Sequence, residues 1–177
     1  MADGRRQESI VFPDRAYNKA MERKHDIWPY VIFIFLSLLT GGLATLVSMD
    51  GMKAFQFLPQ SPLTPPPVVF SVVWSILYIL MGVSAALVYV APPRGLKDQH
   101  LLYGGTLLLN FLWPVLFFAL ELRLAALVTL LVMLALAIGT VIRYRPVSKP
   151  AAWLQLPYTL WLCFAFYLNL TAYQLNG

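Results

Sequence analysis

Charged residues are scarce in this sequence, and they are missing from long stretches of it. They make up 12% of the 177 residues, whereas a soluble domain carries about 25%. Five stretches contain no Asp, Glu, Lys or Arg, and a helix needs about 20 apolar residues to cross a bilayer core about 30 Å thick. These stretches therefore predict membrane spans. The predicted spans are 28–47, 68–91, 101–120, 124–142 and 151–173.

Reactive side chains are equally scarce. The one cysteine, Cys163, lies within an apolar stretch, which excludes a disulfide or a thiolate metal cluster within the chain. The sequence has no His-x-x-x-His pair, phosphate-binding loop or Ser–His–Asp set. The spans also lack the ionisable residues that proton-coupled pumps use. We therefore predict no metal site and no obligatory cofactor, and the absences argue against hydrolytic enzymes and ion-coupled transporters.

The spans predict an all-α integral membrane protein, a five-transmembrane-helix bundle. Helices satisfy their own backbone hydrogen bonds in lipid, and the alternating pattern of a membrane β-barrel is absent. The bundle occupies residues 28–177 and follows a polar N-terminal arm, residues 1–27. Because the basic residues lie in this arm and in short loops, we expect the lipid bilayer as a partner and no nucleic acid.

The distribution of Lys and Arg predicts the orientation. The arm holds six, residues 92–100 hold two and residues 143–150 hold three, so eleven lie on one side of the membrane. The other side has two, one in the first loop (48–67) and one in the turn at 121–123. The positive-inside rule then places the N-terminus in the cytoplasm, and the first loop and the C-terminus outside.

Aromatic and amide side chains recur at helical spacing on three spans, so each set shares one helix face. The faces comprise Phe70, Trp74 and Tyr78 on the second span, Asn110, Trp113, Pro114 and Phe117 on the third, and Tyr158, Trp161, Ala165 and Asn169 on the fifth. On the predicted topology they reach similar depths beneath the first loop. This arrangement suits a flat, largely apolar ligand. The alternative is that these rings simply pack the bundle, as aromatic stripes usually do.

Two prolines interrupt the spans that carry these faces. Pro114 leaves the carbonyl of Asn110 without its amide donor, and Pro157 does the same for Trp153. Membrane helices tolerate such breaks where neighbouring groups or a cavity satisfy the backbone again.

The first loop, residues 48–67, is rich in proline and long beside the other connections. Its length predicts a lid over the bundle, with a simple connector as the alternative. At its end, Thr64 is expected to cap the second span and Pro65 to be the first helical residue.

Three motifs then stand out together. They are PPPVVFSVVWSILYILMG at 65–82, LNFLWPVLFF at 109–118 and LPYTLWLCFAFYLN at 156–169. In this order, with five spans and a long first loop, residues 28–177 resemble the TspO/MBR family. Its members are also called translocator, peripheral benzodiazepine receptor-like or tryptophan-rich sensory proteins, and this chain resembles a bacterial-type member.

The resemblance implies a homodimer in a bacterial cell membrane that acts as a receptor or sensor. It implies binding of porphyrins or haem-like tetrapyrroles, and of other hydrophobic ligands, in a pocket under the first loop. By position, the pocket residues would be Trp74, Tyr78, Asn110, Trp113, Pro114, Phe117, Trp161 and Ala165, to which the helix faces add Phe70 and Tyr158. Two alternatives follow: light-dependent porphyrin breakdown through Trp74 and Trp161, or transport of small hydrophobic solutes.

The sequence departs from the family pattern in two places. Leu63 and Val68 occupy positions near the Pro-Pro pair where members of the family carry tryptophan, so the loop is expected to contribute less to ligand binding. Tyr173 is not followed by Lys or Arg, so the short sterol motif of the family is incomplete.

Overall fold

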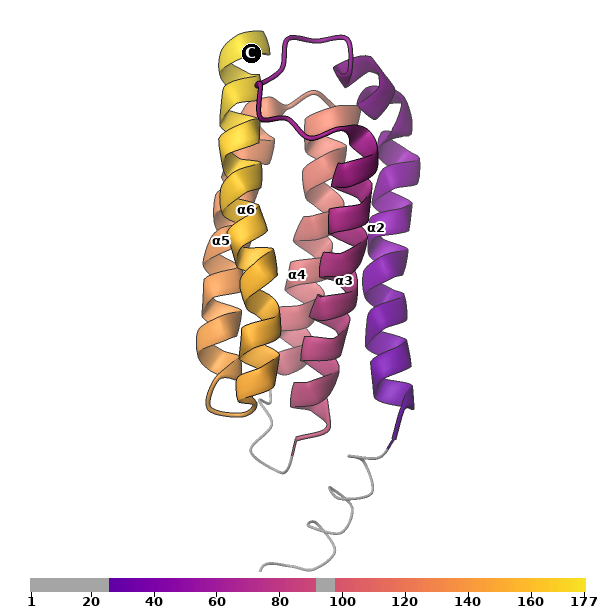
Figure 1. Cartoon of the computed structure of the whole chain (residues 1–177), viewed down its shortest axis with the longest axis vertical. Coiled ribbons are helices and arrows are strands. Elements are labelled where there is room, and N and C mark those ends of the chain that lie inside the picture. Colours follow the sequence, from indigo (N-terminus) through magenta and orange to yellow (C-terminus); the bar gives the residue numbers. More distant parts are fainter. Residues whose placement is uncertain (1–25, 92–97) are drawn as a thin grey trace, which may run out of the picture.

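The computed structural model describes residues 26–91 and 98–177, and the elements within them are helical (Figure 1). The helices are α2 (Trp28–Phe55), α3 (Pro67–Tyr89), α4 (Gln99–Pro114), which continues into the π-helical turn η1 (Val115–Ala119), α5 (Arg123–Tyr144) and α6 (Lys149–Asn176). Five helical segments, with α4 and η1 counted as one, are long and apolar enough to cross a membrane. The prediction of an all-α, five-span membrane protein is confirmed. The predicted N-terminal arm lies outside the described residues except for its last two positions.

The first helix extends further than the hydropathy pattern predicts. It runs eight residues past position 47, through Asp50 and Lys53, and ends at Phe55. Charge ends an apolar run but does not end a helix, and these two side chains form an exposed ion pair with an N–O distance of 3.5 Å. Lys53 in the last turn also complements the helix dipole. The first loop is therefore residues 56–66, about half its predicted length.

The second helix begins one residue before the predicted span and two residues after the predicted first helical residue, Pro65. Pro66 is its N-cap and Pro67 its first residue, so neither Thr64 nor Pro65 has the predicted role. A residue that precedes proline is disfavoured in the helical conformation. Pro65 and Pro66 each precede another proline, and Pro67 is the first residue of the run that does not.

The helices form one bundle. α3 packs against α2 on one side and α6 on the other, and α4 packs against α2 and α5. α2 and α3 approach closely because Gly82 has no side chain: a Cβ atom there would lie 2.6 Å from the Cα atom of Ile34. Such small residues are how membrane helices gain contact without a hydrophobic driving force between them.

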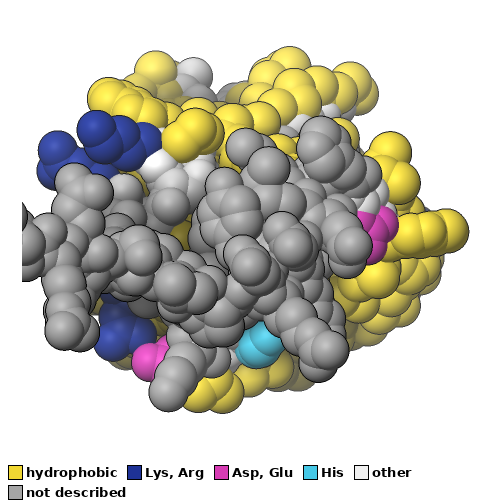
Figure 2. Space-filling model, turned by 90° about the horizontal axis from the view of Figure 1, so that it is seen from below, with side chains coloured by type: hydrophobic (Ala, Val, Ile, Leu, Met, Phe, Trp, Pro, Cys, Tyr) yellow, Lys and Arg dark blue, Asp and Glu magenta, His cyan; other side chains and the backbone are white. Residues whose placement is uncertain are grey.

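Basic side chains gather at the end of the bundle opposite the first loop. Figure 2 views this end and shows Lys and Arg side chains beside a flank that is mostly apolar. Here Arg143 of α5 pairs with Asp98, with an N–O distance of 3.4 Å. The exposed apolar flank is what a helix bundle presents to lipid.

Candidate ligand cavity

A cavity of about 930 Å³ lies beneath the first loop. Ligand pockets span about 300–1,000 Å³, so its volume is in the upper part of that range. Its walls come from α2, α3, α6, the end of α4 and η1, and the loop residues Gln60, Ser61 and Thr64–Pro66 cover it. Seven residues predicted from the sequence line it together: Phe70, Trp74, Tyr78, Trp113, Pro114, Phe117 and Ala165.

Aromatic rings build one continuous wall of this cavity. Trp74 stacks on Trp113 with ring centroids 5.8 Å apart and planes 25° apart, and Trp113 stacks on Phe117 at 5.9 Å and 24°. Tyr78 continues the series, 5.6 Å from Trp74. All four side chains are buried, between 5% and 7% exposed. Nearly parallel ring faces of this kind suit contact with a flat conjugated ligand.

Of the indole N–H groups of Trp113 and Trp74, the first has a hydrogen-bond partner among the described residues and the second has none. The Nε1 of Trp113 donates to Oδ1 of Asn169 at 3.2 Å, and Nδ2 of Asn169 donates to the backbone carbonyl of Arg123 at 3.2 Å. The Nε1 of Trp74 is buried and has no partner among the described residues. A buried donor without a partner costs about 1–3 kcal/mol, so an acceptor atom on a bound molecule would relieve that cost.

The interruption of helix α4 at Pro114 shapes the cavity wall. Pro114 has no N–H to donate, and after it the helix widens into the π-helical turn η1. The Leu120 N–H closes this wider turn by donating to the Val115 carbonyl at 2.9 Å. The turn places Phe117 in the wall and Phe118 against it, at 4.7 Å and nearly perpendicular. Such π-turns are rare and frequently occur at functional sites.

Asn110 and Tyr158 do not line the cavity. The Asn110 amide Nδ2 donates to the Tyr158 hydroxyl and to the Thr106 carbonyl, both at 2.8 Å. Tyr158 is 1% exposed, and its ring meets Trp74 edge-on at 6.4 Å. The pair therefore supports the aromatic wall from behind, and Asn110 lies outside the cavity lining.

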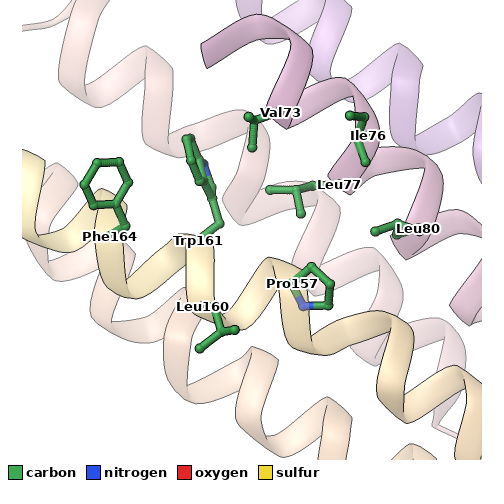
Figure 3. Close-up of a pocket in the computed structure, with 8 residues that line it drawn as sticks. All are labelled: Val73, Ile76, Leu77, Leu80, Pro157, Leu160, Trp161 and Phe164. Carbon is green, nitrogen blue, oxygen red and sulfur yellow. The ribbon is translucent and has the colours of Figure 1, made fainter. Parts of the chain in front are cut away.

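Trp161 also lies apart from the cavity. It faces a groove between α3 and α6 (Figure 3), and its ring lies beside that of the cavity residue Phe70, at a centroid distance of 6.0 Å. Helix geometry explains the difference, because each step of four residues turns about 40° past a full turn. Two such steps separate Trp161 from Asn169, which does line the cavity.

The contribution of α2 was not predicted. Gly41, Ala44 and Phe55 line the cavity from this helix. A Cβ atom at Gly41 would overlap the ring of Tyr78, so the glycine makes room for that ring. The only signal in the sequence is the Gly41–Gly42 pair within an apolar span, which indicates close approach but not its partner.

The first loop covers the cavity and is tied to α6. The Asn176 amide donates to the Pro59 carbonyl at 3.0 Å, and the Ser61 and Tyr167 hydroxyls lie 3.3 Å apart. Leu63 and Val68 are 60% and 74% exposed and do not line the cavity. The covering atoms come from the neighbouring polar and proline residues instead.

Comparison with known proteins identifies the same family as the three sequence motifs. The model of the TspO/MBR family matches residues 30–174. The translocator protein of Bos taurus is 35% identical over 152 residues, which covers 84% of this chain and 90% of that protein. The tryptophan-rich protein TspO of Chlorobaculum tepidum is 38% identical over 117 residues, 63% of this chain and 72% of that protein. The translocator protein of Homo sapiens is 34% identical over 131 residues, 72% and 77% of the two chains.

Proposed function

Since this chain belongs to the TspO/MBR family, whose membership supports a receptor or sensor role at the membrane, we propose that it binds a porphyrin or a similar flat tetrapyrrole in the cavity. The observation that carries the proposal is the wall of stacked rings formed by Trp74, Trp113 and Phe117. We also propose a homodimer in a bacterial cell membrane, from the family resemblance alone. From the distribution of Lys and Arg we propose a cytoplasmic N-terminus, with the first loop and the C-terminus outside.

Binding is proposed to proceed by burial and stacking. A conjugated macrocycle laid against the aromatic wall gains dispersion contacts along its whole face. The Nε1 of Trp74 is a donor that has no partner among the described residues, and it can meet an acceptor atom at the edge of the ligand. The first loop then excludes lipid and water from the upper side of the cavity.

Among the described residues, Lys53 and Arg123 are the cations near the loop end that carboxylate groups of a porphyrin can meet. Lys53 has a side chain that is 66% exposed, and among the described residues it pairs with exposed Asp50. Arg123 is 11% exposed and already contacts Glu121 and the Asn176 carbonyl. We propose Lys53 as the more available of the two, since it exchanges a weak surface ion pair for the ligand.

The experiment titrates purified protein in detergent with protoporphyrin and follows the porphyrin absorption band. Trp74→Ala removes the central ring and is expected to weaken binding at least tenfold, about 1.4 kcal/mol. Trp153→Ala is the matched control, because Trp153 is 70% exposed near the start of α6 and far from the cavity. Equal affinity of the Trp74→Ala variant and the unmodified protein contradicts the proposal.

Binding is favoured over light-dependent breakdown by the positions of the tryptophans. Of the two residues expected to take part in breakdown, Trp74 lines the cavity and Trp161 lies behind Phe70. Illumination of the porphyrin complex distinguishes the two functions: loss of the absorption band faster than for free porphyrin would favour breakdown.

A further inference from the structure

A second concave surface lies on the lipid-facing side of the bundle, between α3 and α6. It is a groove of about 510 Å³, and Figure 3 shows its side chains converging from the two helices. Its lining residues are Val73, Ile76, Leu77 and Leu80 of α3 and Pro157, Leu160, Trp161 and Phe164 of α6. Every side-chain atom in this set is carbon except the Trp161 indole nitrogen.

The groove lies inside the membrane-spanning part of both helices. On α3 it begins six residues after Pro67, and on α6 it begins eight residues after Lys149. At 1.5 Å per residue these positions are about 9–12 Å from the helix ends, which is well within the hydrocarbon layer of a bilayer. In that layer no water is available to hydrogen-bond a polar group.

The edges of the groove project into the surrounding layer. Ile76 is 51% exposed and Leu160 is 69% exposed, while Leu77 at the bottom is 3% exposed. The surface is therefore a furrow with raised sides and a closed floor. In a bilayer, the molecules that contact these exposed edges are lipid chains.

The groove is separate from the ligand cavity. The rings of Phe70 and Trp161, with centroids 6.0 Å apart, form the partition, because Phe70 lines the cavity and Trp161 lines the groove. Leu77 is likewise a groove residue, whereas its neighbour Tyr78 is a cavity residue. Successive residues of α3 thus serve two different surfaces.

We propose that this groove is a binding site for one hydrocarbon chain of a bilayer lipid. A chain in the furrow touches protein atoms on its two sides and beneath it, whereas a chain beside a convex helix touches them on one side. Dispersion contacts are individually small and add with their number, so a chain in the groove is held longer than its neighbours in the lipid shell. The site requires nothing of the head group, which remains at the membrane surface.

Native mass spectrometry of the full chain in mild detergent tests this site. The unmodified protein is expected to retain one phospholipid per chain after the loosely held shell is removed. Ile76→Trp fills the groove and should reduce the retained fraction at least about fivefold, the effect of losing about 1 kcal/mol of apolar contact. Leu131→Trp is the control: Leu131 lies on α5 and is 49% exposed, close to the 51% of Ile76.

Circular dichroism confirms that the variants keep the helical content of the parent. If Ile76→Trp does not fold, Leu160→Trp tests the same groove from the other edge. Equal lipid retention in the groove variant and the control overturns the proposal, as does a protein that retains no lipid. A change from dimer to monomer without a change in lipid mass also overturns it, since a second copy of the chain would then cover the groove. None of these outcomes depends on porphyrin binding.

Discussion

The two ends of the helix bundle use their buried polar groups in opposite ways. At the end away from the first loop, which we call the anchor half, Ser84, Gln99 and Gln155 bond across helices: Ser84 Oγ donates to the Ala151 carbonyl at 2.8 Å and accepts from Gln155 Nε2 at 3.1 Å. Gln99 donates to the carbonyl of Ala85. These bonds join α3 to α4 and α6, so they hold the helices of the anchor half together.

At the loop end, which we call the cavity half and which comprises the cavity and the adjoining turns of α2, some buried polar atoms have no partner among the described residues. Among the described residues these atoms include Trp74 Nε1 and, on α2, Ser48 Oγ. Hydrogen bonds left unmade and space left unfilled both reduce stability. The difference indicates that the anchor half holds the helices in place so that the cavity half can remain open to a ligand.

The largest expected effect comes from the contact that joins α2 and α3. Gly82→Val places a side chain against the backbone of Ile34, and we expect a loss of about 3 kcal/mol in the free energy of unfolding. Denaturation by SDS from mild detergent micelles, followed by circular dichroism, measures it. Gly139→Val is the control because, among the described residues, nothing outside its own helix lies within 4 Å of the Cβ position at Gly139. Equal stability of the two variants would contradict the packing described here.

The next effect separates ligand affinity from stability in the cavity half. Gly41→Val pushes the Tyr78 ring toward the cavity, and protoporphyrin affinity should fall about tenfold, about 1.4 kcal/mol. Gly139→Val on α5 is the control, because Gly139 does not line the cavity and its Cβ position meets nothing within 4 Å outside its own helix among the described residues. Porphyrin titration compares them, and a tenfold loss in the control as well would show that the ring position is not the cause.

A smaller effect is expected in the anchor half. Gln155→Leu removes the amide that donates to Ser84, and interhelical bonds of this kind contribute about 1 kcal/mol to stability. Unfolding in SDS should register this loss, while protoporphyrin affinity stays at the parent value. A drop in affinity comparable to that of Gly41→Val would break the distinction between the two halves.

The smallest effect concerns the cover of the cavity. Tyr167→Phe removes the hydroxyl that contacts Ser61, and porphyrin dissociation should accelerate about twofold, about 0.4 kcal/mol. Stopped-flow absorption measures the rate. Tyr173→Phe provides the comparison, since the Tyr173 hydroxyl makes no hydrogen bond within the described residues. Faster dissociation in both variants would assign the effect to the helix end and not to the loop.

Much of the fold could be predicted because lipid imposes a simple rule. Runs of about 20 residues without charge have to be spanning helices, and the number of spans follows. The helix ends could not be predicted from this rule, because it reports where charge begins and not where hydrogen bonding stops. α2 therefore continues past Asp50 and Lys53, which can reach water from the end of a helix.

The cavity could be predicted in part. The faces of α3 and α4 were recognisable from their spacing, and Trp74 and Trp113 stack as their positions suggest. The spacing on α6 placed Trp161 with Ala165, but it does not show how far a face rotates relative to a neighbouring helix. The contribution of α2 could not be predicted, because its apolar residues are not confined to one face and Gly41 acts by the space that it leaves.

Hydrogen–deuterium exchange with and without protoporphyrin tests the central claim most directly, since it reports on both halves of the same molecule. If the ligand occupies the cavity, protection should increase in the first loop, residues 56–66, and around η1, residues 113–122, which both border it. Residues 144–155 of the anchor half should exchange at the same rate in both states. Protection spread equally over both halves, or confined to the anchor half, would contradict the account.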